Sequence, residues 1–249
     1  QTGDIITAPG LWHLDNYGNK LIATIVDGAT FEWDSDGSTS TRATLVTSAP
    51  TATRQTLVST PDRHLVFFGT ETTIGTTSTQ DDMYIRWSEQ EDINTYAPSA
   101  TNTAGTQRLA DGTRIIAAIK GRDAIYIWTN HALFIMRFVG APFVFSFQQV
   151  GTGCGLIGKN AAVEVDGSAY WMSENGFFRY TGKLESLPCL VEDYVYDDLN
   201  TVPRNHIYAG LNNLFGEVTW FYPGSGAASN NRSVTYNYMD STAERPVWT

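Results

Sequence analysis

Four carboxylates that lie close together in the sequence are the residues whose type most suggests catalysis: Glu164, Asp166, Glu174 and Glu185. Glycoside hydrolysis needs two such groups across the scissile bond, one as acid and the other as base or nucleophile. Glu164 and Asp166, however, alternate with two valines directly before a turn, which is typical of the solvated face of a strand. We therefore predict no catalytic carboxylate pair.

A glycine-rich run at 153–158 reads GCGLIG and satisfies the G-x-G-x-x-G pattern of dinucleotide sites. That pattern binds a pyrophosphate only where it opens a helix whose N-terminus faces the ligand. Residues 159–165 are too few for such a helix before the Asp-Gly turn at 166–167. We predict instead a tight connection between two sheets, because glycine permits close backbone approach.

Other catalytic and metal-binding patterns are missing from the sequence. Neither H-x-H nor H-E-x-x-H spacing occurs among the four histidines, which are His13, His64, His131 and His206. Gly224-Ser225-Gly226 lacks the spacing of a serine nucleophile elbow. Residues 35–39 depart from the S-x-D-x-G-x-T-W box of sialidase-type propellers. We predict no catalytic, cofactor-binding or metal-binding residues, no cofactor and no enzyme activity.

Two features leave alternatives open. Cys154 and Cys189 belong to no C-x-x-C pair, so they are either two separate core residues or the halves of one disulfide. Residues 86–92 (RWSEQED) are either a turn with Ser88 and Glu91 in capping-box register or a patch that binds a partner.

The composition argues against tight nucleic-acid binding. The 249 residues are 42% hydrophobic and only 17% charged, with a net charge of -10. Its 16 basic residues are scattered among 26 acidic ones, whereas displacing counterions from phosphates takes clustered cations. Such a surface suits DNA that passes without sticking. The sequence shows no apolar run of membrane-spanning length and no signal segment, and its ends at Gln1 and Thr249 suggest a processed or partial copy of a longer protein.

An internal repeat provides the elements that would position these residues. SAYWMS at 168 has counterparts at 20 (KLIATI), 64 (HLVFFG), 124 (AIYIWT) and 217 (EVTWFY), spaced by 44, 60, 44 and 49 residues. A strand-like run precedes and another follows each copy. In the fourth copy the runs are joined by Asp166-Gly167 and by Glu174-Asn175-Gly176, and both are hairpin signals.

A period of about 45 residues is the length of a four-stranded propeller blade. Because a single meander is marginal in water, stacked sheets must bury both faces, which explains continuous apolar runs such as LVFF. We predict an all-β fold, a β-propeller-like array of about five antiparallel meander blades in a single domain over 1–249, with a β-sandwich as the alternative. The residues expected at inter-blade contacts are Trp33, Trp87, Trp128, Trp171 and Trp220.

Polar insertions interrupt the repeat at 70–82, 97–114 and 223–232, and loops of this length are often functional. One short helix is expected within 191–200. There Val191, Tyr194, Val195 and Leu199 fall on one helical face.

Four segments resemble structural proteins of tailed bacteriophages: 11–24, 84–116, 143–182 and 187–200. The chain is most similar in type to the tail nozzle or tubular tail hub proteins of short-tailed phages, although these are usually far longer. The resemblance implies a ring in the virion tail, commonly a hexamer, that forms a DNA conduit. Implied partners are further copies of the chain, the adaptor, the portal or other tail proteins, and passing DNA, with assembly in the host cytoplasm. The alternative function is a carbohydrate- or receptor-binding propeller, ahead of a glycoside hydrolase.

Overall fold

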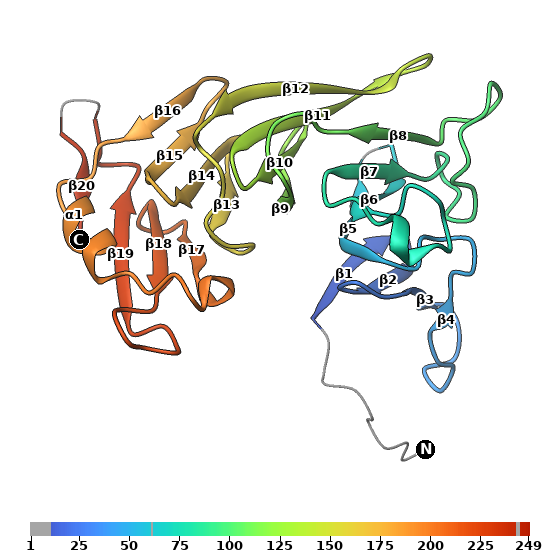
Figure 1. Ribbon diagram of the computed structural model, residues 1–249, viewed down its shortest axis with the longest axis horizontal. Coiled ribbons are helices and arrows are strands. Elements are labelled where there is room, and N and C mark those ends of the chain that lie inside the picture. The colour runs from blue at the N-terminus through green and yellow to red at the C-terminus, as the bar shows by residue number, and fades with distance from the viewer. Residues whose placement is uncertain (1–10, 61, 243–244) are drawn as a thin grey trace. The chain divides into compact units, whose positions relative to one another are not determined.

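Five four-stranded β-sheets make up the fold of this computed structural model, which describes residues 11–60, 62–242 and 245–249. In each sheet, strands consecutive in the sequence are neighbours, as in an antiparallel meander (Figure 1). Such a meander is the blade of a β-propeller. The predicted all-β, propeller-like array of about five meander blades is therefore confirmed.

The chain divides into two compact units, and the described residues of the first are 11–60, 62–110 and 138–144. Its first blade consists of β1 Trp12–Tyr17, β2 Lys20–Ile25, β3 Thr30–Asp34 and β4 Thr44–Leu45. Its second blade consists of β5 Thr53–Ser59, β6 His64–Thr70, β7 Tyr84–Trp87 and β8 Gly105–Arg108, with the 3₁₀ helix η1 Thr77–Thr79 before β7.

The second unit, residues 111–137 and 145–249, holds the remaining blades apart from the tip of one hairpin. The third blade is β9 Ile115–Lys120, β10 Ile125–Thr129, β11 Ala132–Gly140 and β12 Val144–Thr152. The fourth is β13 Ala162–Val165, β14 Ser168–Ser173, β15 Gly176–Tyr180 and β16 Leu184–Leu187. The fifth is β17 Tyr208–Asn212, β18 Glu217–Tyr222, β19 Arg232–Asn237 and β20 Val247–Trp248. Helices α1 Glu192–Asp198 and η2 Arg204–His206 separate the last two blades in the sequence. That 1–249 forms a single domain stays a prediction.

The repeat in the sequence corresponds to the second strand of every blade, namely β2, β6, β10, β14 and β18. The fourth strands are harder to recognise. Strand β8 lies inside residues 97–114, which were expected to be a polar insertion; the segment is polar but contains this strand. This outermost strand exposes Gln107 and Arg108 and needs no apolar alternation.

Turn chemistry sets the hairpins of the fourth blade. Asp166 and Gly167 have φ values of 51° and 82°, as a type I′ turn requires. The next hairpin closes on Glu174 and Asn175, because Gly176 already pairs with Ser173.

Helix α1 confirms the one predicted helix but not its predicted face. Val195 is buried, whereas Tyr194 is 67% exposed. Tyr196 turns inward instead: its hydroxyl donates to the Ser173 carbonyl oxygen at 2.8 Å and accepts from the Gly176 amide at 3.1 Å. The short helix is thus held on the β14–β15 turn by hydrogen bonds as well as by an apolar contact.

Tryptophans from the second strands link successive blades of the second unit. The rings of Trp128 in β10 and Trp171 in β14 lie 5.4 Å apart, and Trp220 in β18 lies 4.9 Å from Phe177 in β15. Trp87 is also buried, as predicted. Trp33 is the exception: it is only half-buried and its indole donates to Thr41 in the β3–β4 loop. Among the described residues, no helix is long and apolar enough to cross a membrane.

Candidate functional site

Glu164, Glu174 and Glu185 are separated by the blade that carries them, and Asp166 lies beside Glu164 at the β13–β14 turn. Glu164 lies at the β13–β14 end and Glu174 at the β14–β15 end, so the six residues of β14, about 17 Å of strand, stand between them. Glu185 lies in β16, three strands across from β13, or about 14 Å. Both separations exceed the roughly 5–9.5 Å between the carboxyl groups of glycosidases.

Each of these carboxylates except Asp166 also has a local partner. Glu164 accepts from the Gly167 amide at 2.7 Å and closes the β13–β14 turn. Glu174 pairs with Arg204 and Glu185 with Arg179, both at 2.7 Å. A hollow of about 520 Å³ beside this turn is lined by Lys120, Gly121, Arg122, Glu164, Asp166 and Gly167, a mixture of both charges. These contacts account for the carboxylates as turn and surface residues.

The glycine-rich run forms the connection between β12 and β13. A Cβ on Gly155 would overlap the Asn130 carbonyl group, and one on Gly158 would overlap the Arg204 carbonyl oxygen. Strand β13 starts at Ala162, so no helix follows the run. The glycines therefore serve close backbone packing, as predicted, and the geometry lacks the helix that a pyrophosphate site requires.

The two cysteines are unpaired, Cys154 buried and Cys189 half-buried, which settles the alternative in favour of separate residues. Burial raises the pKa of both thiols to about 11. The thiolate is the nucleophile in cysteine chemistry, and the raised pKa keeps both thiols largely protonated near neutral pH.

Two Asp-His-Thr clusters were not anticipated from the sequence. In the first unit, His64 Nδ1 lies 2.7 Å from an Asp62 carboxylate oxygen, and His64 Nε2 lies 3.3 Å from the Thr103 hydroxyl. The order acid, imidazole, hydroxyl is that of a nucleophile triad. His64 and Asp62 are buried, however, and the Thr103 oxygen already accepts from the Gln90 amide at 2.8 Å. The cluster ties the β5–β6 turn to the segment before β8.

The second cluster lies on the surface of the second unit. His131 Nδ1 is 2.7 Å from Asp111 and 3.0 Å from the Thr152 hydroxyl, and Gln149 donates to the other Asp111 oxygen. The hydrogen bond with His131 holds the pKa of Asp111 below its usual value. His13 and His206 belong to neither cluster, and no three metal-binding side chains gather among the described residues. Asp62 lies only two residues before His64, but Thr103 lies 39 residues after it, and Asp111 and Thr152 lie 20 and 21 residues from His131, which explains why spacing patterns did not reveal the clusters.

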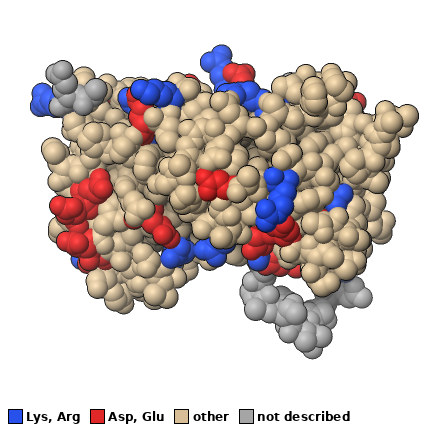
Figure 2. All heavy atoms as spheres, turned by 45° about the horizontal axis from the view of Figure 1, so that its top comes forward, with Lys and Arg blue, Asp and Glu red and all other residues tan. Residues whose placement is uncertain are grey.

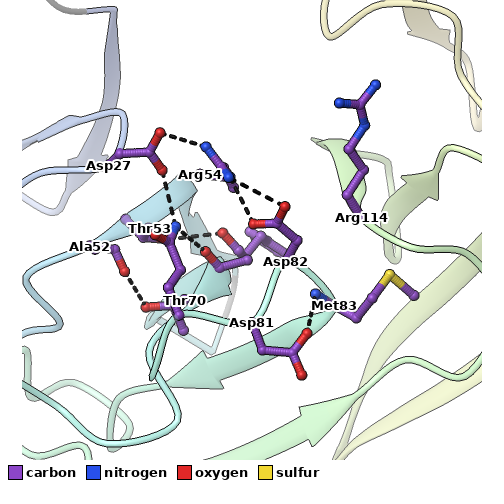
Figure 3. A network of polar contacts seen from close by, with 12 residues as sticks. Asp27, Ala52, Thr53, Arg54, Thr70, Asp81, Asp82, Met83 and Arg114 are labelled. Atoms are coloured by element: carbon purple, nitrogen blue, oxygen red, sulfur yellow. Dashed lines mark hydrogen bonds and ion pairs between the residues drawn. The ribbon is translucent and has the colours of Figure 1, made fainter. Parts of the chain in front are cut away.

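Arg54 joins the first two blades (Figure 3). From β5 its guanidinium pairs with Asp27 in the β2–β3 turn at 2.5 Å and with Asp82, before β7, at 2.9 Å. Gln80 donates to the other Asp27 oxygen at 3.0 Å. The hydrogen bond to Asp82 raises the pKa of Arg54. Because one guanidinium bridges carboxylates from the β2–β3 turn and from the segment before β7, this network is a clamp between the first two blades.

The insertion at 70–82 is anchored by a buried acid and a buried base. The Glu71 carboxylate accepts from the Thr51 amide and hydroxyl and from the Gly75 amide at 2.7 Å. Arg86 in β7 donates to the carbonyl oxygens of Glu71, Thr72 and Tyr96. Burial lowers the pKa of Arg86.

The predicted capping box at 88–91 does not form. The Ser88 hydroxyl accepts from the Leu65 amide and donates to the Glu89 carbonyl, while Glu91 pairs with Arg63. Asp92 caps the turn instead, accepting from the Asn94 amide at 2.8 Å and the Thr95 hydroxyl at 2.7 Å. That this segment binds a partner stays a prediction. Residues 35–39 and 224–226 lie in the β3–β4 and β18–β19 loops.

Charged side chains form small separate groups, some mixed and some acidic only, and uncharged ones cover most of the face shown in Figure 2. This face offers no broad basic area of the kind that phosphate binding requires. It agrees with the low charged fraction of 17%.

A further surface of the first unit is the outer face of the first blade. Strand register places on it eight apolar side chains and Asn16, with no charged residue; the apolar ones are Trp12 and Leu14 from β1, Leu21, Ala23 and Ile25 from β2, Phe31 and Trp33 from β3, and Leu45 from β4. Trp12 is 50% exposed and Leu14 64%. Leu45 is 50% exposed as well, so this contiguous apolar face is a candidate interaction surface.

Comparisons with known proteins support the fold alone. No protein family and no curated protein matches the sequence. Among solved structures, Saccharomyces cerevisiae Sqt1 matches 96% of this chain at 9% identity with a TM-score of 0.58. The AfRom2 CNH domain matches 88% of this chain at 13% identity with a TM-score of 0.52. The extracellular domain of BT4673 from B. thetaiotaomicron matches 95% of this chain at 12% identity with a TM-score of 0.52. The chain spans 61%, 65% and 29% of the lengths of these three chains.

Proposed function

We propose that this chain is a structural protein of the virion tail of a short-tailed bacteriophage, of the nozzle or hub type. It has no catalytic role and forms part of the conduit for DNA. Its partners are further copies of itself in a ring, in the manner of a hexamer, together with the adaptor, the portal or other tail proteins. Assembly takes place in the host cytoplasm.

The observation that carries the proposal is the uncharged outer face of the first blade, which is typical of a subunit that is completed by assembly. The side chains with catalytic potential support it too. They hold turns or ion pairs, as Glu164, Glu174 and Glu185 do. The resemblance of four sequence segments to phage tail proteins supplies the specific setting. The net charge of -10 fits DNA that passes without being bound.

Electron microscopy of the purified chain and of virions tests the proposal. We expect a ring in negative stain, and gold-labelled antibodies against the chain on the tail of intact particles. A protein absent from virions would overturn the tail assignment. Hydrolysis of any glycoside in a broad panel, lost in the Glu164→Gln variant, would overturn the structural role.

A receptor-binding propeller is the second candidate, favoured by one aromatic pair. Tyr208 is 43% exposed and stacks on Phe221 at 4.8 Å with an interplanar angle of 18°, a flat platform of the kind that sugar rings contact. Binding on a glycan array that disappears with Tyr208→Ala supports this candidate, and the absence of any hit removes it.

A further inference from the structure

The two faces of the first blade differ sharply in chemistry and in cover. Its inner face packs on β5 of the second blade, where Ile22, Thr24 and Thr30 are buried. There the Thr56 hydroxyl donates to Thr24 at 2.9 Å and the Val58 amide donates to Asp15 at 2.6 Å. The outer face keeps Trp12, Leu14 and Leu45 half or more exposed. In the first unit, another sheet therefore covers the inner face of the first blade, whereas these three side chains of its outer face stay exposed.

We propose that a second copy of this chain covers the outer face of the first blade, packing with its own first-blade outer face in a symmetric pair. Self-complementarity is the first reason. In a symmetric interface the same patch of both chains meets, so any charge on the patch would lie near the same charge of the partner. The outer face of the first blade carries no charged residue and therefore avoids this repulsion. The second reason is net charge. Two chains of -10 each repel one another least where they meet through uncharged surface.

The dimensions of the face set the expected strength. Four strands of about five residues span roughly 19 by 17 Å, clearly less than the roughly 800 Å² that each partner gives to a standard interface. Pairing through this face alone is therefore weak and depends on concentration. The inference rests on the proposed function in one respect, because it assigns a partner to the same assembly face. The symmetric pair is a contact in addition to the head-to-tail contacts of a ring, so it can be tested without a tail.

Sedimentation velocity of the full chain between about 1 µM and about 100 µM tests the pairing, because weak interfaces dissociate in this range. We expect a shift from monomer to dimer. Leu14→Lys should weaken dimerisation at least about tenfold, since burying an unpaired charge is costly. Leu214→Lys is the matched control: Leu214 is 81% exposed in the β17–β18 turn of another blade, and the variant should dimerise normally.

A cross-linking variant gives a second readout. Leu14→Cys combined with Cys189→Ser should form disulfide-linked dimers under mild oxidation, whereas Leu214→Cys in the same background should not. Circular dichroism confirms that each variant is folded. A chain that stays monomeric up to about 100 µM, or dimers that Leu14→Lys leaves unchanged, would overturn the inference whatever the microscopy of virions shows.

Discussion

The indole nitrogen of Trp220 donates a hydrogen bond of 3.0 Å to the carbonyl oxygen of Ala161, 59 residues earlier in the chain. The indole of Trp171 likewise donates to the Cys154 carbonyl oxygen at 2.8 Å. Both acceptors belong to the connection between β12 and β13. Tryptophans of two successive blades are thus tied to one glycine-rich segment.

Replacing these tryptophans tests how much the hydrogen bonds contribute. Trp171→Phe removes the indole donor of the buried Cys154 carbonyl, which costs about 1–3 kcal/mol in addition to the loss of ring volume. Trp220→Phe removes one of two donors to the Ala161 carbonyl, because the Met172 amide also donates to it at 3.1 Å. Trp128→Phe is the matched control, because the buried Trp128 Nε1 has no acceptor within the described part of the chain. Urea unfolding should rank Trp128→Phe as clearly the mildest of the three; equal losses would show that packing alone accounts for the effect.

The sequence was sufficient to predict the central strands of the blades, because a strand that is buried on both faces needs apolar residues at successive positions. Strand β6 is buried at all seven positions and β10 at all five, and both stand out in the sequence. The fourth strands carry no such pattern, because an outer strand has one neighbour and tolerates polar residues, as β8 does with Gln107 and Arg108.

The polar clusters could not be predicted for a different reason. His64 meets Thr103 across 39 residues, and Arg54 meets Asp27 across 27 and Asp82 across 28. Each contact depends on how two strands or loops come together in space, which local spacing does not report. The outer face of the first blade was hidden for the same reason: its apolar character appears only when the register of four strands is known.

Gly155 should be far more sensitive to substitution than Gly153. An added Cβ at Gly155 would overlap the Asn130 carbonyl group, whereas nothing lies within 4 Å of one at Gly153. Gly153 has a φ of 70°, so Gly153→Ala carries only the left-handed backbone penalty of about 1–2 kcal/mol. We expect Gly155→Ala to lower the midpoint of thermal unfolding more than Gly153→Ala does. The reverse order would mean that the β12–β13 connection is not closely packed.

Gly69 should prove necessary for the Arg54 clamp. A Cβ at Gly69 would come within 2.6 Å of Arg54 Cγ, so the arginine stem needs the missing side chain. Gly75 has a similar positive φ of 80° but open space around it, which makes Gly75→Ala the control. We expect Gly69→Ala to be the more destabilising by about 1–3 kcal/mol, the usual range for overpacking. Urea unfolding measures both; a double variant with Arg54→Ala should recover part of the loss, since it removes the clashing stem.

Acid should weaken the first unit in part through Asp92. The Thr95 hydroxyl, and then the Asn94 amide, hold the pKa of Asp92 below its usual value. A carboxyl group whose pKa is lower in the folded chain stabilises the fold above its unfolded pKa of about 3.9, and this contribution is lost as the pH falls through the folded value. Thr95→Val removes the hydroxyl donor, so the free energy of unfolding should fall less between pH 6 and pH 3 than in the unmodified chain. Thr101→Val, at an exposed threonine whose hydroxyl faces Ser99, is the control and should retain the full acid dependence. An unchanged pH profile for Thr95→Val would show that Asp92 does not couple folding to acid.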